Sequence, residues 1–160
     1  MKLEEAITYA IMSDGHGKTT DQIAAAINRN GWHIRKDGKI IAEGVNRVTA
    51  NNDPTAHAEV TAIRKACSDL KTFDLTGCTI YTSCEPCPMC LGAIYWSHID
   101  RMYYGNTQKE AAKIDFDDKF IYDEIARPVA ERRLKSEPLL HEEAWEGFQA
   151  WVDNTEKVEY

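Results

Sequence analysis

The sequence predicts an α/β fold in which helices pack against a mixed sheet. Strand-like and helical stretches alternate between residues 32 and 104, an order typical of a sheet with helices on its faces. The chain has no internal repeat, linker or low-complexity segment. Its 160 residues, of which 43% are hydrophobic and 28% charged, are enough for a buried core. We therefore expect residues 1–160 to form a single domain.

Apolar residues at helical spacing predict two short helices near the N-terminus, over residues 3–12 and 20–29. A glycine-containing turn joins them, so that residues 1–31 resemble half of a winged-helix module. Residues 1–36 carry five basic and four acidic side chains without a basic cluster, which does not favour DNA recognition. We expect an atypical helical segment that packs on the main sheet.

Alternating patterns predict four strands, over residues 32–35, 39–45, 78–83 and 99–104. The first two are joined by a hairpin turn at Asp37-Gly38. Residues 46–53 are polar and predict a loop that carries Asn46 to the edge of a pocket.

Helices are predicted between and after these strands. One follows residue 53, with Asp53 or Thr55 as its cap. Its core-facing residues should be Val60, Ile63, Cys67 and Leu70. A second helix covers residues 87–96, and residues 116–122 pass from a loop into a third. The last helix has an apolar face suited to the core or to docking on another subunit, formed by Ala144, Trp145, Phe148, Trp151 and Val152.

Two motifs carry the chemistry: His57-Ala58-Glu59 and Pro86-Cys87-Pro88-Met89-Cys90. His57, Cys87 and Cys90 supply one imidazole and two thiolates, which suit a zinc ion and leave its fourth position for water, as in catalytic sites. Glu59 stands two residues beyond His57, close enough to face that water without binding the metal. This pattern is the signature of zinc-dependent nucleobase deaminases.

Two other interpretations of the cysteines are weaker. Cys84 and Cys87 also form a C-x-x-C pair of the redox type, but that reading leaves His57-Ala58-Glu59 and Pro86 unexplained. A structural zinc knuckle would need a fourth protein ligand, and no other histidine lies in a second paired motif.

Charge and composition limit the partners and the location. A net charge of −7 argues against sequence-independent binding of nucleic acid and fits a small neutral substrate better. No apolar run is long enough to span a bilayer, and no signal-peptide pattern is present. Five cysteines, three of them clustered as metal-ligand candidates, read as reduced thiols, so we expect a cytoplasmic protein.

The longer strings around both motifs, residues 53–64 and 81–96, resemble the small bacterial guanine deaminases of the cytidine deaminase-like superfamily. The resemblance extends from about Lys36 to Tyr160. It implies a single deaminase domain with a three-layer α/β/α sandwich and a mixed five-stranded sheet. It also implies one zinc ion per subunit, hydrolysis of guanine to xanthine and ammonia in purine catabolism, and a homodimer with exchanged C-terminal segments.

The same resemblance implies roles for the site residues. His57, Cys87 and Cys90 would bind zinc, and Glu59 would transfer protons. Asp118 would contact the amino end of the purine and assist the departure of ammonia. The remaining contacts to the substrate would come from Asn46, Ala58, Trp96 and the partner's Tyr160.

The segment before Lys36 departs from the family pattern. The family has a small, apolar strand there, whereas residues 28–35 of this chain are charged and bulky, and Asn30 replaces the phenylalanine that would stack on the purine. Two alternatives therefore stay open. The substrate could be another base, namely cytosine, a triazine, guanosine or adenosine in tRNA. Alternatively, the chain is a deaminase-fold protein with impaired catalysis and a winged-helix-like N-terminal binding segment.

Overall fold

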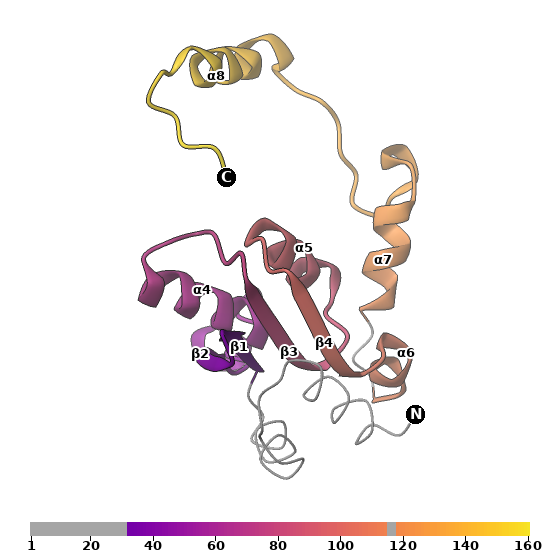
Figure 1. Ribbon diagram of the computed structural model, residues 1–160. Coiled ribbons are helices and arrows are strands. Elements are labelled where there is room, and N and C mark those ends of the chain that lie inside the picture. The colour runs from indigo at the N-terminus through magenta and orange to yellow at the C-terminus, as the bar shows by residue number, and fades with distance from the viewer. Residues whose placement is uncertain (1–31, 115–117) are drawn as a thin grey trace. The chain divides into compact units, whose positions relative to one another are not determined.

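The computed structural model describes residues 32–114 and 118–160 (Figure 1). The helices expected within residues 1–31, and their packing on the sheet, lie outside the described residues. The chain divides into two compact units, Met1–Lys119 and Phe120–Tyr160, which are considered separately.

The first unit contains a four-stranded mixed sheet with the order β2-β1-β3-β4. Its strands are β1 (Trp32–Lys36), β2 (Lys39–Gly44), β3 (Cys78–Cys84) and β4 (Arg101–Asn106). β1 is antiparallel to β2 and β3, whereas β3 and β4 are parallel. The expected mixed sheet is confirmed. The described residues form four strands, whereas the resemblance implies five for the whole domain.

The charged and bulky residues of β1 fit into the sheet because the strand alternates. Ile34 is fully buried and faces the core, opposite Ile80 of β3. His33 and Arg35 point to the other face, where both meet Tyr81. The rings of His33 and Tyr81 stack 4.9 Å apart, and the Arg35 guanidinium lies 5.8 Å from the Tyr81 ring centre. A cation and an aromatic face attract at this separation, so Tyr81 accommodates the unusual strand.

Helices α4 (Ala58–Leu70) and α5 (Pro88–Trp96) cover one face of the sheet (Figure 1). Their inward side chains join those of the strands in one core, which includes Ile34, Ala42, Ala62, Ala66, Leu75, Ile80 and Ile94. The prediction of which α4 residues face the core was partly wrong. Val60 and Ile63 are buried, but Leu70 is 42% exposed, and the fully buried residues of the helix are Ala62 and Ala66.

The segment before α4 also differs from the prediction. Asp53 Oδ1 accepts hydrogen bonds from the backbone N–H and the hydroxyl of Thr55, so these two residues form their own turn. The N-cap of α4 is His57 instead. The loop predicted over residues 46–53 contains a single helical turn, α3 (Val48–Asn51).

The alanines of α4 allow the helix to lie very close to β2 at Gly44. A Cβ atom added to Gly44 would overlap the Ala58 carbonyl oxygen and would lie 2.5 Å from the Ala62 nitrogen. Because these are backbone atoms, the whole helix would have to move.

We therefore expect Gly44→Ala to lower the free energy of unfolding by about 1–3 kcal/mol, the usual cost of overpacking. Denaturant unfolding measures this change. Gly92→Ala is the matched control, since a Cβ there meets nothing within 4 Å and alanine favours the helix. Equal stability of Gly44→Ala and the wild type would show that α4 does not approach β2 as described.

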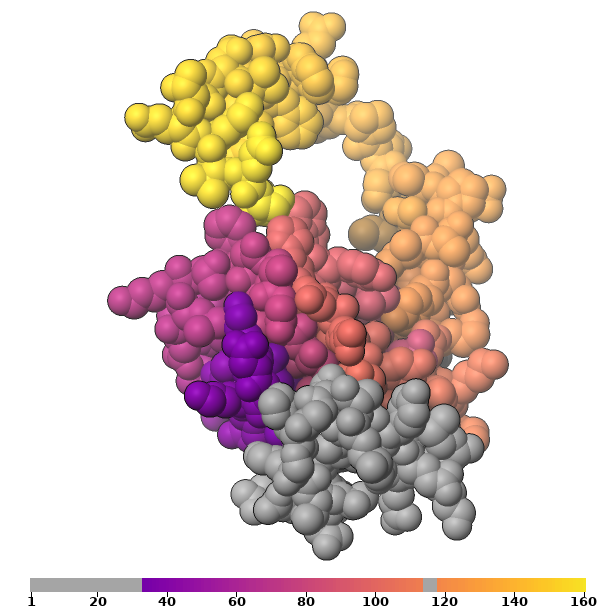
Figure 2. All heavy atoms as spheres, in the orientation of Figure 1, coloured from indigo at the N-terminus to yellow at the C-terminus, as the bar shows by residue number. Residues whose placement is uncertain are grey.

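The second unit contains α8 (His141–Asp153), preceded by the short helix η2 (Val129–Glu131) and most of α7 (Lys119–Ala126). The apolar face predicted for the last helix is present, but it is exposed: Trp145 is 56% and Phe148 65% exposed. Their rings meet edge to face at 5.7 Å. Figure 2 shows the side chains of α8 in yellow. Of the two expectations for this face, burial in a core is wrong for the described chain.

None of the helices within residues 32–114 and 118–160 is long and apolar enough to cross a membrane.

Candidate metal centre

Three of the predicted ligand atoms come together at the starts of two helices. Nδ1 of His57 lies 3.6 Å from Sγ of Cys87 and 3.4 Å from Sγ of Cys90. All three atoms lie within 4.8 Å of one another. His57 is the N-cap of α4, Cys87 is the N-cap of α5, and Cys90 lies in the first turn of α5.

Local sequence explains why these residues occupy helix starts. The buried strand β3 ends at Cys84, and Pro86 is fully buried in the loop that follows. Pro88 occupies the first position of α5, where its fixed φ angle suits the helix and its missing N–H is not needed. The exposed N–H groups of a helix start stabilise thiolates, so both sulfurs lie where negative charge is favoured.

The geometry fits tetrahedral zinc. With Zn–S bonds of about 2.3 Å and Zn–N bonds of about 2.0–2.1 Å, tetrahedral angles place nitrogen and sulfur ligands about 3.5–3.6 Å apart. The two N···S separations, 3.6 and 3.4 Å, agree with this spacing. Three protein ligands leave one position for water, as in catalytic rather than structural zinc sites.

The acid–base properties of the Cys87 and Cys90 thiols also favour the binding of a cation. A hydrogen bond from the Cys90 thiol lowers the pKa of Cys87 to about 6. The same interaction, together with burial, raises the pKa of Cys90 above its ordinary value. The pair therefore carries one negative charge readily, and a divalent ion beside both sulfurs would favour the loss of the second proton.

Glu59 lies in the first turn of α4 and is only 5% exposed. Burial raises the pKa of its carboxyl above the ordinary value, and the negative charge of Cys87 acts in the same direction. His57 and Cys90 act in the opposite direction, so Glu59 lies beside all three metal-ligand candidates. A carboxyl group in this position can accept and return a proton near the metal.

The predicted substrate residues are distributed unevenly around this centre. Ala58 is buried next to His57. Asn46 is exposed and accepts a hydrogen bond from the Val48 N–H at 3.0 Å. The next residue, Arg47, donates its backbone N–H to the Ala56 carbonyl at 2.8 Å, which holds the Asn46 loop beside the residue preceding His57.

Asp118 is half-buried and directly precedes α7. Burial is the main cause of the raised pKa of the Cys84 thiol, and the charges of Asp118 and Glu59 raise it further. The charges of both carboxylates, Asp118 and Glu59, therefore act on the Cys84 thiol.

Two predicted residues lie away from the ligand atoms or in the other unit. Trp96 is 65% exposed at the last position of α5, nine residues beyond Cys87, or about 13 Å along the helix axis. Tyr160 is 70% exposed in the second unit.

Sequence reasoning missed the residues that support the cysteine loop. Glu85 accepts a hydrogen bond from the backbone N–H of Gln108, and Asn106 donates one to the Ser83 carbonyl. The only available signal was the position of Glu85 directly before the cysteine motif, between Cys84 and Pro86. Its partners are 23 residues away, so no local pattern identifies them.

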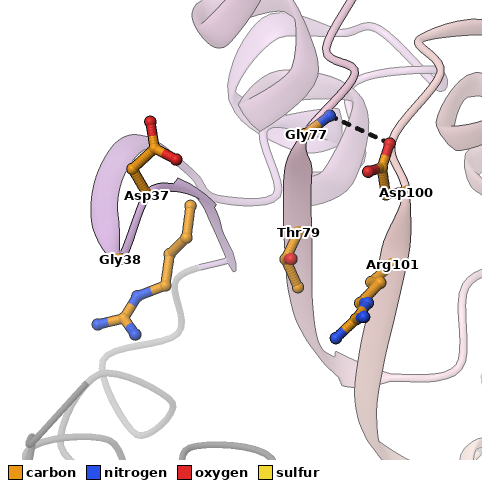
Figure 3. A pocket seen from close by; sticks show the side chains of 7 residues that line it. Asp37, Gly38, Gly77, Thr79, Asp100 and Arg101 are labelled. Atoms are coloured by element: carbon orange, nitrogen blue, oxygen red, sulfur yellow. Dashed lines mark hydrogen bonds between the residues drawn. The ribbon is translucent and has the colours of Figure 1, made fainter. Parts of the chain in front are cut away.

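A separate hollow of about 270 Å³ lies at the end of the sheet (Figure 3). Its lining contains side chains of both charges: the basic residues Arg35 and Arg101 and the acidic residues Asp37 and Asp100. None of the predicted metal or substrate residues lines it. The candidate centre is therefore the cluster of His57, Cys87 and Cys90 at the starts of α4 and α5, and not this hollow.

Comparisons with known proteins agree with this centre. Residues 6–106 match the family described as the cytidine and deoxycytidylate deaminase zinc-binding region. This match contains all three ligand candidates and part of the N-terminal segment that departs from the expected pattern. A guanine deaminase of Bacillus subtilis is 54% identical over 127 residues, which cover 79% of this chain and 81% of that protein.

More distant relatives act on other substrates. A tRNA-specific adenosine deaminase of Aquifex aeolicus is 36% identical over 113 residues, covering 71% of this chain and 72% of that protein.

Among solved structures, the X-ray structure of the Bacillus subtilis guanine deaminase has a TM-score of 0.79 and 47% identity. That similarity covers 99% of this chain and 96% of the other.

Proposed function

We propose that this chain, which belongs to the cytidine and deoxycytidylate deaminase family, is a zinc-dependent hydrolase that converts guanine and water to xanthine and ammonia. The observation that carries the proposal is the cluster of His57, Cys87 and Cys90 at two helix starts, with the buried Glu59 beside it. The higher identity to a guanine deaminase, 54% against 36% for the tRNA enzyme, favours guanine.

The protein side chains would divide the proton transfers between them. When bound, zinc lowers the pKa of its water toward neutrality and so supplies a nucleophile. Glu59 accepts the proton from water and passes it to the ring nitrogen beside C2, while the water oxygen bonds to C2. Glu59 then transfers the proton of the new C2 hydroxyl to the amino group. The C2–N bond breaks, ammonia leaves, and the C2 carbonyl of xanthine remains. The raised pKa of Glu59 suits a group that must both take and give a proton.

We assign the substrate contacts as follows. Asn46 binds the purine edge, the backbone of Ala58 binds a ring position beside His57, and Trp96 packs near the ring. Asp118 contacts the amino end. The hydrogen bond that holds the Asn46 loop to Ala56 supports the first of these assignments. The effect of the Asp118 charge on the Cys84 thiol, which also senses Glu59, supports the last.

Asp118→Asn tests the choice of guanine. Guanine presents an amino group and ring N–H donors on one edge, which a carboxylate matches as an acceptor. The contact strengthens as the amino group gains a proton, so it acts on the transition state. We expect kcat to fall about 10–100-fold, since hydrogen bonds to charged groups contribute about 1.5–3 kcal/mol. Zinc content should not change.

The competing explanation is that Asp118 caps α7, which begins at Lys119. Asparagine caps a helix about as well as aspartate, so the substitution would then be silent. Wild-type turnover of guanine by Asp118→Asn would exclude the catalytic role.

We also propose a homodimer in which the unit Phe120–Tyr160 is exchanged and the partner's Tyr160 closes each pocket. The exposed apolar face of α8 supports this, because isolated chains seldom leave Trp145, Phe148 and Trp151 uncovered together. In this arrangement the two units together form one deaminase domain for each zinc ion.

Light scattering should therefore give twice the chain mass of 18.1 kDa. Trp145→Ala with Phe148→Ala should weaken the dimer and its activity together, because both side chains leave the apolar face. Glu146→Ala on the polar side of α8 is the control. A monomer at micromolar concentration with full activity would contradict the shared pocket.

A panel of substrates tests the function itself. Ammonia release is measured with guanine, guanosine, cytosine, adenine, the triazine ammeline and tRNA, with zinc quantified in the same samples. We expect guanine to have the highest kcat/KM. Preference for another base would change the substrate, and one zinc per chain with no turnover would indicate a deaminase fold with impaired catalysis.

A cytoplasmic location is consistent with the cysteines, since Cys67, Cys78, Cys84, Cys87 and Cys90 are all free thiols.

A further inference from the structure

Glu85 lies in the loop between β3 and α5 that brings Cys87 to the metal centre, and the mechanism above does not use it. Its Oε2 atom accepts a hydrogen bond from the backbone N–H of Gln108 at 3.1 Å. Its Oε1 atom accepts one from the side-chain Nε2 of the same residue at 3.4 Å. Gln108 is the first residue of α6 (Gln108–Ala111), so the carboxylate holds the cysteine loop to the start of that helix.

Two further hydrogen bonds join the same segments. The Glu85 backbone N–H donates to the Asn106 carbonyl at 2.8 Å, and the Asn106 side-chain amide donates to the Ser83 carbonyl at 2.9 Å. Pro86, the next residue, is fully buried. Both the backbone and the side chain of Glu85 are therefore fixed to the end of β4 and the start of α6.

This attachment lies directly beside the metal ligands. Glu85 precedes Cys87 by two residues, and Cys87 begins the helix whose first turn carries Cys90. A displacement of Glu85 would shift Cys87 and change the distance from its Sγ atom to His57 Nδ1, which is 3.6 Å. Groups that orient metal ligands in this indirect way influence metal affinity strongly.

We propose that Glu85 is a positioning residue that prearranges the cysteine loop for zinc by binding the start of α6. The inference rests on the zinc centre of the proposed function but not on its substrate. By holding the loop before the ion arrives, the Glu85–Gln108 contact removes part of the ordering that metal binding would otherwise require. It should therefore strengthen zinc binding and maintain the tetrahedral arrangement of the three ligands.

Glu110 provides a matched control within the same short helix. Its carboxylate Oε2 accepts hydrogen bonds from the Thr107 backbone N–H at 2.8 Å and from the Thr107 hydroxyl at 2.9 Å. Glu85 and Glu110 thus both support the start of α6 through a backbone N–H. The Glu85 carboxylate joins α6 to the cysteine loop, whereas the hydrogen bonds of the Glu110 carboxylate to Thr107 stay within residues 107–110.

The experiment compares the zinc-loaded full-length chain with Glu85→Ala, Glu85→Gln and Glu110→Ala. Zinc affinity is measured by competition with a chelator, and the cobalt-substituted proteins are compared by their thiolate-to-cobalt absorption. We expect Glu85→Ala to bind zinc about 10–100-fold more weakly and to alter the cobalt spectrum. Glu110→Ala should bind zinc within about threefold of the wild type and keep its spectrum.

Glu85→Gln keeps the side-chain volume and one acceptor, so we expect a smaller loss of affinity. This variant decides the question if Glu85→Ala does not fold. Wild-type affinity and spectrum in Glu85→Gln and in any folded Glu85→Ala would overturn the proposal. Equal losses in the Glu85 and Glu110 variants would also overturn it, since both would then act only through α6. No substrate is needed, so a failure to deaminate guanine leaves this result interpretable.

Discussion

Glu59→Gln is expected to lower kcat for guanine by at least about 10²–10⁴-fold, the usual contribution of general acid–base catalysis. Glutamine keeps the shape of the buried side chain but cannot accept and return a proton. Because Glu59 is not one of the three ligand candidates, zinc content should stay at the wild-type level. Steady-state assays with metal quantified in the same sample measure both quantities.

Glu43→Gln serves as the control for this substitution, since Glu43 is an exposed carboxylate on β2. It should leave kcat and zinc content unchanged. If Glu59→Gln instead turned over guanine at a rate close to the wild type with zinc bound, another group would have to carry the proton.

Loss of the metal is the second large effect. His57→Ala, Cys87→Ser and Cys90→Ser should each strip most of the zinc, because each removes one of only three protein ligands. Activity should fall with the metal. Zinc per chain after gel filtration provides the measurement.

Cys84→Ser is the internal control for the ligand set. Cys84 belongs to the alternative C-x-x-C pair, but its sulfur lies near the Thr107 carbonyl at 3.9 Å and is not part of the ligand cluster. We expect this variant to keep its zinc. Zinc loss in Cys84→Ser with retention in Cys87→Ser would mean that the other cysteine pair binds the metal.

The strands and the metal ligands could be predicted because their signals are local. The hairpin turn at Asp37 and Gly38 has positive φ at both residues, as a two-residue hairpin with an aspartate-glycine pair requires. Strands predicted over residues 32–35 and 39–45 are observed as β1 and β2 within one residue at each end. Likewise, the spacing of Cys87 and Cys90 places both sulfurs on one side of a helix start.

The features that were predicted wrongly depend on contacts between distant segments. The alanines of α4 face the core because Gly44 allows the helix to lie close to β2. Helical periodicity alone does not reveal this contact. The N-cap moves to His57 because Asp53 and Thr55 bond to each other. The side chains of His33 and Arg35 on β1 are accommodated by the ring of Tyr81, which lies far from them in the chain.

The contacts of Glu85 could not be predicted for the same reason. Its partners, Asn106 at the end of β4 and Gln108 at the start of α6, follow in the chain only after α5. Parallel pairing of β3 and β4 brings their C-terminal ends together, and this pairing is a property of the fold rather than of either sequence segment. Motif matching therefore identifies the ligands but not the residues that hold them in place.

The most direct test of the zinc-dependent guanine deamination is product analysis with the purified, zinc-loaded chain. Guanine should be converted to equal amounts of xanthine and ammonia, the conversion should stop when a chelator removes the metal, and added zinc should restore it. Absence of xanthine from protein that carries one zinc ion per chain and is folded would contradict the account.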